Sequence, residues 1–126
     1  MKTITLTNAQ LNAFNSPIFK ALIGDKSRPF PVMDAFRLYE ITTSLQDKLS
    51  TYNKTVSELL TRHNVEVLPT GEVVYKEEDV RELVNGELKK LNELEIDIPG
   101  EKLTISETWP NLTLQEISIL RPLLNG

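Results

Sequence analysis

"PVMDAFRLYEITTSLQDKLSTYNKTVSELLTRHN", residues 31–64, carries the strongest helical pattern in this sequence. Apolar side chains recur on one face, and from Leu45 to Leu59 they follow at steps of 4, 3, 4 and 3 residues, which is typical of a helix–helix seam. Thr42 stands where this spacing would place an apolar residue. Pro31 suits the first position of a helix, and Asn64 suits a left-handed cap. The apolar stripe comprises Leu38, Leu45, Leu49, Tyr52, Val56 and Leu59. We therefore predict one long helix from residue 31 to about 63.

A second helical pattern covers residues 78–93, where Val80, Val84, Leu88 and Leu91 recur at steps of 4, 4 and 3 residues. This second helix can pack antiparallel on the long helix within the same chain, so we favour the apolar stripe as part of the core. In that case we expect the Leu49→Asp variant to unfold. A homodimer seam along residues 45–59 is the alternative. Gly86 follows Asn85 inside the pattern, and a helix break is possible there because glycine disfavours helix interiors.

Three further patterns predict β-structure. Residues 3–6 alternate and are β-branched, and residues 65–75 outline a hairpin around Pro69-Thr70-Gly71. Two more strand candidates, "LEIDIP" (94–99) and "KLTIS" (102–106), are separated at Pro99-Gly100. We expect an α+β fold in a single domain, residues 1–126, with short antiparallel strands beside two packed helices.

Short helices are predicted near both termini. Thr7 or Asn8 caps one through about Phe14, and Ser16-Pro17 opens another that ends at Ile23, with Gly24 as a left-handed cap. Near the C-terminus, "TWPNLTLQEISILRPLL" (108–124) has capping-box spacing at Thr113 and Glu116. This segment is either a docking peptide for a partner or a lid on the protein's own core. We favour the lid, because its apolar side chains would otherwise be exposed, and we expect deletion of residues 108–126 to destabilise the protein.

Composition excludes several function classes. The chain has 126 residues, 40% apolar and 25% charged, with a formal net charge of −4, so we expect no direct nucleic-acid binding. It contains no cysteine, which rules out disulfides and thiolate chemistry. We see no secretory signal and no apolar run of membrane-spanning length, so we expect no membrane association.

Candidate chemical groups are few. His63 is the only histidine, and its predicted place at a helix C-terminus favours a capping role over catalysis. The acids at residues 77–79 suit the first turn of a helix. Lys20, Lys26 and Arg28 flank the loop after Gly24 and form either a small patch for an anion or an acidic partner, or ordinary surface charge. We predict no catalytic, metal-binding or cofactor-binding residues.

Several segments follow one another in a familiar order: "LTNAQLNAF" (6–14), "RPFPVMDAFRLYEI" (28–41), "YNKTVSELLTRHN" (52–64) and "LEIDIPGEKLTISETWPNLTLQEISILRPLL" (94–124). In this order the chain resembles a family of small proteins of unknown function encoded by tailed bacteriophages and prophages. The resemblance spans nearly the whole chain and rests on pattern rather than on an invariant motif. It implies a phage origin and a compact α+β fold, and it supplies no catalytic residues.

The resemblance and the composition together suggest a non-catalytic phage protein that works through protein–protein contacts, in virion assembly or as an accessory factor. The alternative is a phage-encoded inhibitor or modulator of a host machine such as RNA polymerase or a defence system. In both cases we expect a phage or host protein partner and a location in the host bacterial cytoplasm, or in the virion.

Overall fold

The computed structural model describes residues 2–125 and has a mixed α+β fold that is mostly helical, as predicted. Its elements are, in chain order, β1 (Thr3–Thr7), α1 (Asn8–Ala13), α2 (Pro17–Gly24), α3 (Val32–Arg62), β2 (Glu66–Val67), β3 (Val73–Val74), α4 (Glu78–Glu93), β4 (Glu95–Pro99), α5 (Leu114–Leu120) and a 3₁₀ turn (Arg121–Leu123). None of the helices within residues 2–125 is both long enough and apolar enough to cross a membrane.

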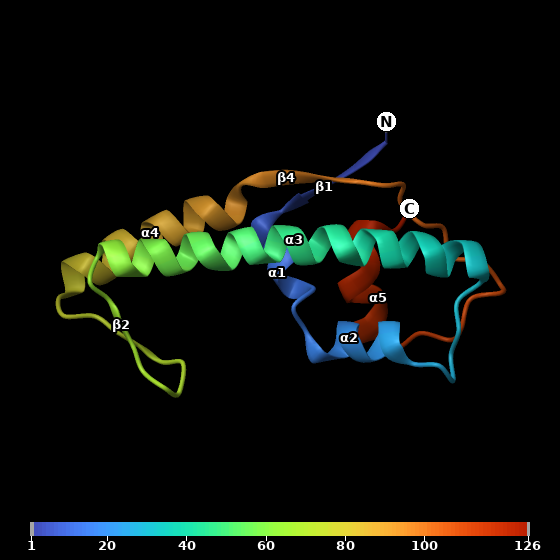
Figure 1. The fold of residues 1–126 in the computed structure, drawn as a ribbon, viewed down its shortest axis with the longest axis horizontal. Coiled ribbons are helices and arrows are strands. Elements are labelled where there is room, and N and C mark those ends of the chain that lie inside the picture. Colours follow the sequence, from blue (N-terminus) through green and yellow to red (C-terminus); the bar gives the residue numbers. More distant parts are fainter. Residues whose placement is uncertain (1, 126) are drawn as a thin grey trace.

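Helix α3 runs along almost the whole molecule, and two groups of elements pack against its two halves (Figure 1). At one end α4 lies antiparallel against its C-terminal half, which confirms the predicted helix pair, and we call residues 51–93 the arm. At the other end β1, α1, α2, β4 and α5 gather around its N-terminal half, and we call residues 2–50 and 94–125 the body. The predicted hairpin is confirmed, with Glu66 opposite Val74 and Val67 opposite Val73.

The predicted end of the long helix is confirmed by its backbone geometry. Asn64 adopts a positive φ of 54°, the left-handed conformation that asparagine tolerates better than most residues. His63 is the C-cap residue, and its backbone N–H donates to the carbonyl of Leu59 at 3.3 Å. The other predicted left-handed cap is wrong, because Gly24 is the last residue of α2 and is not among the described glycines with positive φ.

The strand prediction for residues 102–106 is wrong. Strand β4 instead pairs antiparallel with β1, with Ile4 opposite Ile98 and Leu6 opposite Ile96. In this register Ile4, Leu6 and Ile98 all lie on the buried face. A slip by one residue would turn the apolar side chains of the slipped strand outward, so their burial specifies the register. Beyond Pro99, Gly100 turns the chain away at a φ of 138°. Leu103 then forms only a single parallel bridge with Leu124.

Beside a smaller apolar cluster of Leu38, Leu103 and Trp109, the body has one large apolar cluster. It draws on every element of the body and on the N-terminal half of α3: Ile4, Leu6, Leu11, Phe14, Phe19, Leu22, Ile41, Leu45, Ile98, Leu120 and Leu123. Leu120 and Leu123 are both fully buried, so the prediction that the Trp109 segment covers the protein's own core is confirmed. Trp109 packs edge-on against Phe30 with ring centroids 5.0 Å apart, and its Nε1 donates to Asp34 at 2.8 Å.

The arm is thin by comparison. Between residues 51 and 93, only Leu59 and Val84 are buried among the described side chains. Two polar contacts join its helices: the Tyr52 hydroxyl donates to Asn92 at 2.6 Å, and His63 Nε2 lies 3.4 Å from a carboxylate oxygen of Glu87. The arm therefore depends on half-buried contacts along its length.

The structure answers the open question of a break in α4 and corrects one expectation about the apolar stripe of α3. Helix α4 continues through Asn85 and Gly86 without a break, with Val84 buried before Gly86 and Leu88 half-buried after it. Leu49 is only half-buried at the edge of the core, and Leu45 is the buried residue of the stripe at this level of α3. We therefore now expect a carboxylate to unfold the protein at Leu45 and to be tolerated at Leu49.

Candidate functional site

Arg28, one of three residues in the predicted basic patch, is already engaged within the protein. Its guanidinium donates to both carboxylate oxygens of Glu116, at 2.9 and 2.7 Å, and to Asp25 at 2.9 Å. It also donates to the backbone carbonyl of Asn111 at 3.1 Å. These bonds tie the loop after α2 to the start of α5, so Arg28 has a structural role.

The electrostatics of this cluster reflect the same contacts. Hydrogen bonds from Arg28 and from the backbone of Thr113 lower the pKa of Glu116 to about 2. Hydrogen bonds from Ser27 and then from Arg28 lower the pKa of Asp25 to about 2, and the two carboxylates raise the pKa of Arg28 above its usual range. Glu116 also completes the predicted capping box, since it accepts from the Thr113 N–H at 2.9 Å. The charged forms are thus mutually stabilised.

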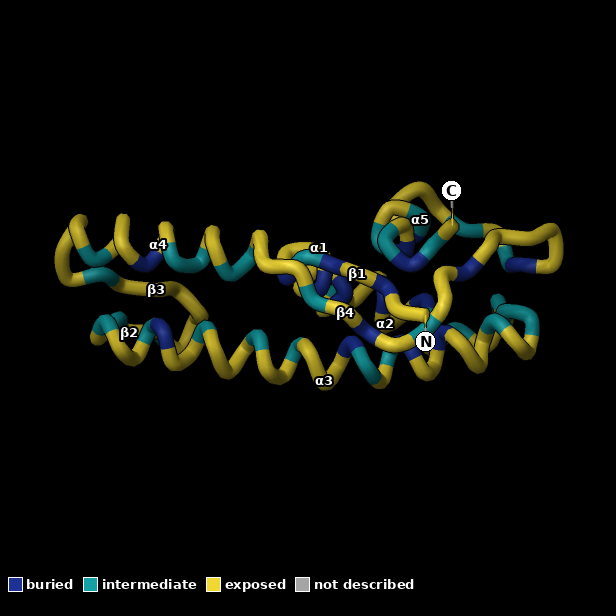
Figure 2. Tube along the Cα trace, turned by 90° about the horizontal axis from the view of Figure 1, so that it is seen from above, coloured by how far each residue is buried: buried dark blue, intermediate teal, exposed yellow. Residues whose placement is uncertain are grey.

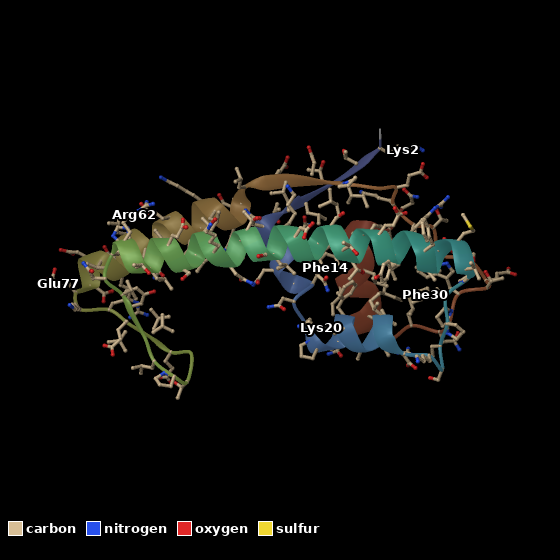
Figure 3. The ribbon with its side chains drawn as sticks, viewed as in Figure 1. Lys2, Phe14, Lys20, Phe30, Arg62 and Glu77 are labelled. Atoms are coloured by element: carbon tan, nitrogen blue, oxygen red, sulfur yellow. The ribbon has the colours of Figure 1, made fainter. Side chains whose placement is uncertain are left out.

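Lys20 and Lys26 are both exposed, and neither forms a salt bridge with any other residue in the range 2–125. Lys26 lies in the turn after α2. Lys20 lies on α2 itself, at the edge of a cleft between α2 and the middle of α3, and Figure 3 shows Lys20 and Phe14 on the same side of the long helix. Of the three residues of the predicted patch, only Lys20 lines this cleft, and the patch itself stays a prediction.

We call this concavity the α2–α3 cleft. Its volume is about 620 Å³, which lies within the range of ligand-binding clefts in proteins. Its lining combines an apolar floor with uncharged hydrogen-bonding groups, and Lys20 is its one charged residue: Phe14, Asn15, Phe19, Lys20, Ile23, Gly24, Thr42, Leu45, Gln46, Leu49, Ser50 and Asn53. Phe14 and Phe19 pack edge-on with centroids 5.0 Å apart, which holds one wall rigid.

A second surface lies on the N-terminal part of α3, and we call it the outer face. It consists of Val32, Met33, Phe36 and Tyr39, whose exposed fractions are 82%, 64%, 59% and 70%. The opposite side of the same turns carries Leu38 and Ile41, which are buried. Figure 2 shows that the crests of α3 turned away from the other elements are exposed along the helix. The outer face is therefore an apolar surface with no partner within the described chain.

The remaining candidates have local structural roles. His63 lies at the C-terminus of α3 beside Glu87, which agrees with the predicted capping position. Glu78 and Asp79 occupy the first turn of α4, where the helix dipole favours negative charge. Within residues 2–125, no three histidine, aspartate or glutamate side chains gather in an arrangement suited to a metal ion.

Sequence reasoning missed both surfaces. The signal for the outer face was present, since Val32, Phe36 and Tyr39 follow at helical steps of 4 and 3 residues on the side opposite Leu38. The cleft left no such signal, because its lining residues come from α2, α3 and the link between α1 and α2, spread from residue 14 to residue 53.

Comparison with known proteins adds no relative: no family model, no curated protein and no solved structure matches this chain.

Proposed function

We propose that this chain is a non-catalytic bacteriophage protein that acts through protein–protein contacts, in virion assembly or as an accessory factor. The α2–α3 cleft is the observation that carries the proposal. Its apolar floor and uncharged polar rim suit a partner's side chains. The phage setting rests on the resemblance of segments such as residues 6–14 and 28–41.

The composition of the cleft specifies the kind of segment that fits it. Leu45, Leu49 and Phe19 supply a surface on which an apolar side chain loses contact with water, at about 25 cal/mol per Å² of buried apolar area. Asn15 and Asn53 offer amide donors and acceptors to the backbone of an inserted segment. Most of the binding free energy is therefore expected from apolar burial, and the direction of the segment from hydrogen bonds.

Lys20 adds charge selectivity. As the one charged residue of the lining, it favours a segment that places a carboxylate beside its apolar side chain. The protein has a net charge of −4, which disfavours an acidic partner overall, and Lys20 offsets this repulsion at the cleft. The proposed contact is therefore an apolar segment of a protein partner with an adjacent acidic group.

Affinity capture from phage-infected cells tests the proposal when it compares four forms of the protein. The wild type and Lys26→Glu are expected to recover the same phage protein, because Lys26 lies outside the cleft lining. Lys20→Glu and Leu49→Glu are expected to lose it, the first by charge repulsion and the second by a carboxylate on the apolar floor. Melting curves establish that each variant is folded.

Two outcomes would redirect the proposal. Recovery of a host protein such as RNA polymerase or a defence nuclease, with the same dependence on Lys20, supports the alternative role of an inhibitor or modulator. Recovery that does not change in either cleft variant contradicts a role of the cleft in partner binding.

A further inference from the structure

The outer face of α3 carries an inference separate from the cleft. Val32, Phe36, Tyr39 and Thr43 follow at steps of 4, 3 and 4 residues and so lie on one side of the helix. With exposed fractions of 59% and 70%, Phe36 and Tyr39 each leave roughly 90–175 Å² of side chain open to water. Together with Val32 and Met33 they form an apolar surface of the size that often marks an interaction site.

A hollow adjoins this surface. It has a volume of about 550 Å³ and lies between α3 and the end of β4, where Gly100 turns the chain. Arg37, Tyr39, Glu40 and Thr43 are among the residues that line it from the helix, and Pro99 at the end of β4 lines it together with Gly100 and Glu101 after the strand. Phe36 lies on the same face, one helical turn before Tyr39 and Glu40 of the hollow. The face thus presents a projecting aromatic ring next to a recess.

Charges on one flank of the face complete the pattern. Arg37 and Glu40 are three residues apart and therefore lie on the same flank of α3. Neither forms a salt bridge with another residue between Lys2 and Asn125. The flank therefore carries one positive and one negative group, both free to pair with a docked surface.

We propose that a second copy of this chain docks on the outer face, with the two α3 helices antiparallel around a two-fold axis near residue 38. In this arrangement Phe36 of each copy enters the hollow beside Tyr39 and Thr43 of the other. By the same symmetry, Arg37 of each copy faces Glu40 of the other, which makes two ion pairs from one self-complementary flank.

The charge pattern selects a second copy over other occupants. A two-fold interface brings position i against j and j against i, and residues 37 and 40 satisfy this with opposite charges. The contact from Val32 to Thr43 extends only about 17 Å along the helix. Stable interfaces bury about 800 Å² per partner, so a face of this length gives a weak dimer that depends on protein concentration. This face differs from the apolar stripe at residues 45–59, which packs inside the chain.

Reversing the charges at residues 37 and 40 tests the proposed dimer. Sedimentation velocity over a concentration range on the order of a hundredfold is expected to show reversible dimers of the wild type. Arg37→Glu and Glu40→Arg each place like charges opposite each other at both symmetry-related positions, and each is expected to raise the dissociation constant at least about tenfold. Lys48→Glu, an exposed change of the same sign on the same helix, serves as the control and is expected to leave dimerisation unchanged.

The decisive sample is an equimolar mixture of the two variants. In the mixed dimer both pairs again bring opposite charges together, so mixing is expected to restore dimers that neither variant forms alone. Melting curves confirm that each variant is folded. A wild type that stays monomeric over the whole range, or variants whose mixture does not associate, would overturn the proposal. Both outcomes leave the cleft-dependent capture of a partner intact, so the two proposals fail separately.

Discussion

Arg28 shows how one side chain joins segments that are far apart in the sequence. A guanidinium presents its donors in a planar fork that matches a carboxylate, and here the fork meets both oxygens of Glu116. The side chain of Glu116 is only 7% exposed, so its charge depends on this partner and on the Thr113 backbone. The C-terminal lid is therefore held on the body by an ion pair as well as by apolar packing.

Replacing Arg28 with Gln is expected to lower the melting temperature at pH 7 by roughly 5–10 °C, because Glu116 then stays charged and buried without its partner. The pKa of Glu116 lies at about 2 in the folded protein and near 4.5 in the unfolded chain. A lowered pKa contributes stability that is fully present above about pH 4.5 and is lost as the pH falls toward 2. The melting difference between wild type and variant should therefore shrink over that window.

Lys26→Gln, two residues away and without an ion pair to the described residues, is the matched control for this experiment. Its melting curve is expected to follow the wild type at every pH. A difference between Arg28→Gln and wild type that stays constant from pH 7 to pH 2 would show that the ion pair does not stabilise the fold.

At the scale of elements, α4 shows a helix that persists against local propensity. Gly86 disfavours a helix interior, yet the helix continues through it, with Val84 buried before it and Leu88 and Leu91 half-buried after it. At the C-terminal end, the buried Asn8 closes the helix: its backbone N–H donates to the carbonyl of Leu94 at 3.0 Å, and its side-chain amide donates to Leu91 at 2.9 Å. Tertiary contacts thus supply what the sequence of α4 lacks.

Gly86→Ala is expected to raise the free energy of unfolding by about 0.5–1 kcal/mol. An added Cβ at this position meets no atom within 4 Å, so the substitution removes backbone freedom from the unfolded chain without a clash. Urea denaturation measures the change. Gly71→Ala is the matched control: its surroundings are equally open, but its φ of 90° strains any side chain, so it is expected to destabilise. Equal effects of the two variants would contradict this explanation.

At the scale of the whole molecule, α3 joins a well-packed body to a thin arm. The body buries a continuous cluster that includes Ile4, Leu45 and Leu120, whereas the arm buries only Leu59 and Val84 among its described side chains. Resistance to local opening follows the apolar area that a segment buries. The outer face lies on the body, and so does the cleft apart from Asn53 at the start of the arm, so the surfaces proposed for binding belong mainly to the more stable part of the molecule.

Amide hydrogen exchange is expected to be faster in the arm than in the body. Amides of α4 and of residues 53–62 of α3 should exchange faster than those of β1 and β4, because the arm opens without unfolding the body. Mass spectrometry of peptic fragments measures the difference, and Gly86→Ala should slow exchange in the arm alone. Uniform protection along the chain would show that the arm and body unfold as one unit.

The sequence by itself determined most of the elements. Capping boxes at Thr7 and Thr113, the apolar period of α3 and the left-handed Asn64 all act through hydrogen bonds and side chains a few residues apart. For this reason the helices, the hairpin and the antiparallel helix pair were predicted close to their observed positions. The burial of the C-terminal segment also followed from its composition.

Only the tertiary structure decided which distant segments meet. Strand β4 pairs with β1 across most of the chain, Arg28 meets Glu116, which lies 88 residues later, and Lys20 lines a cleft. The outer face is exposed because Leu38 and Ile41, on the opposite side of α3, are the residues that pack into the body. Local signals cannot specify such contacts, because all elements compete for one core and the winning arrangement depends on their combined packing.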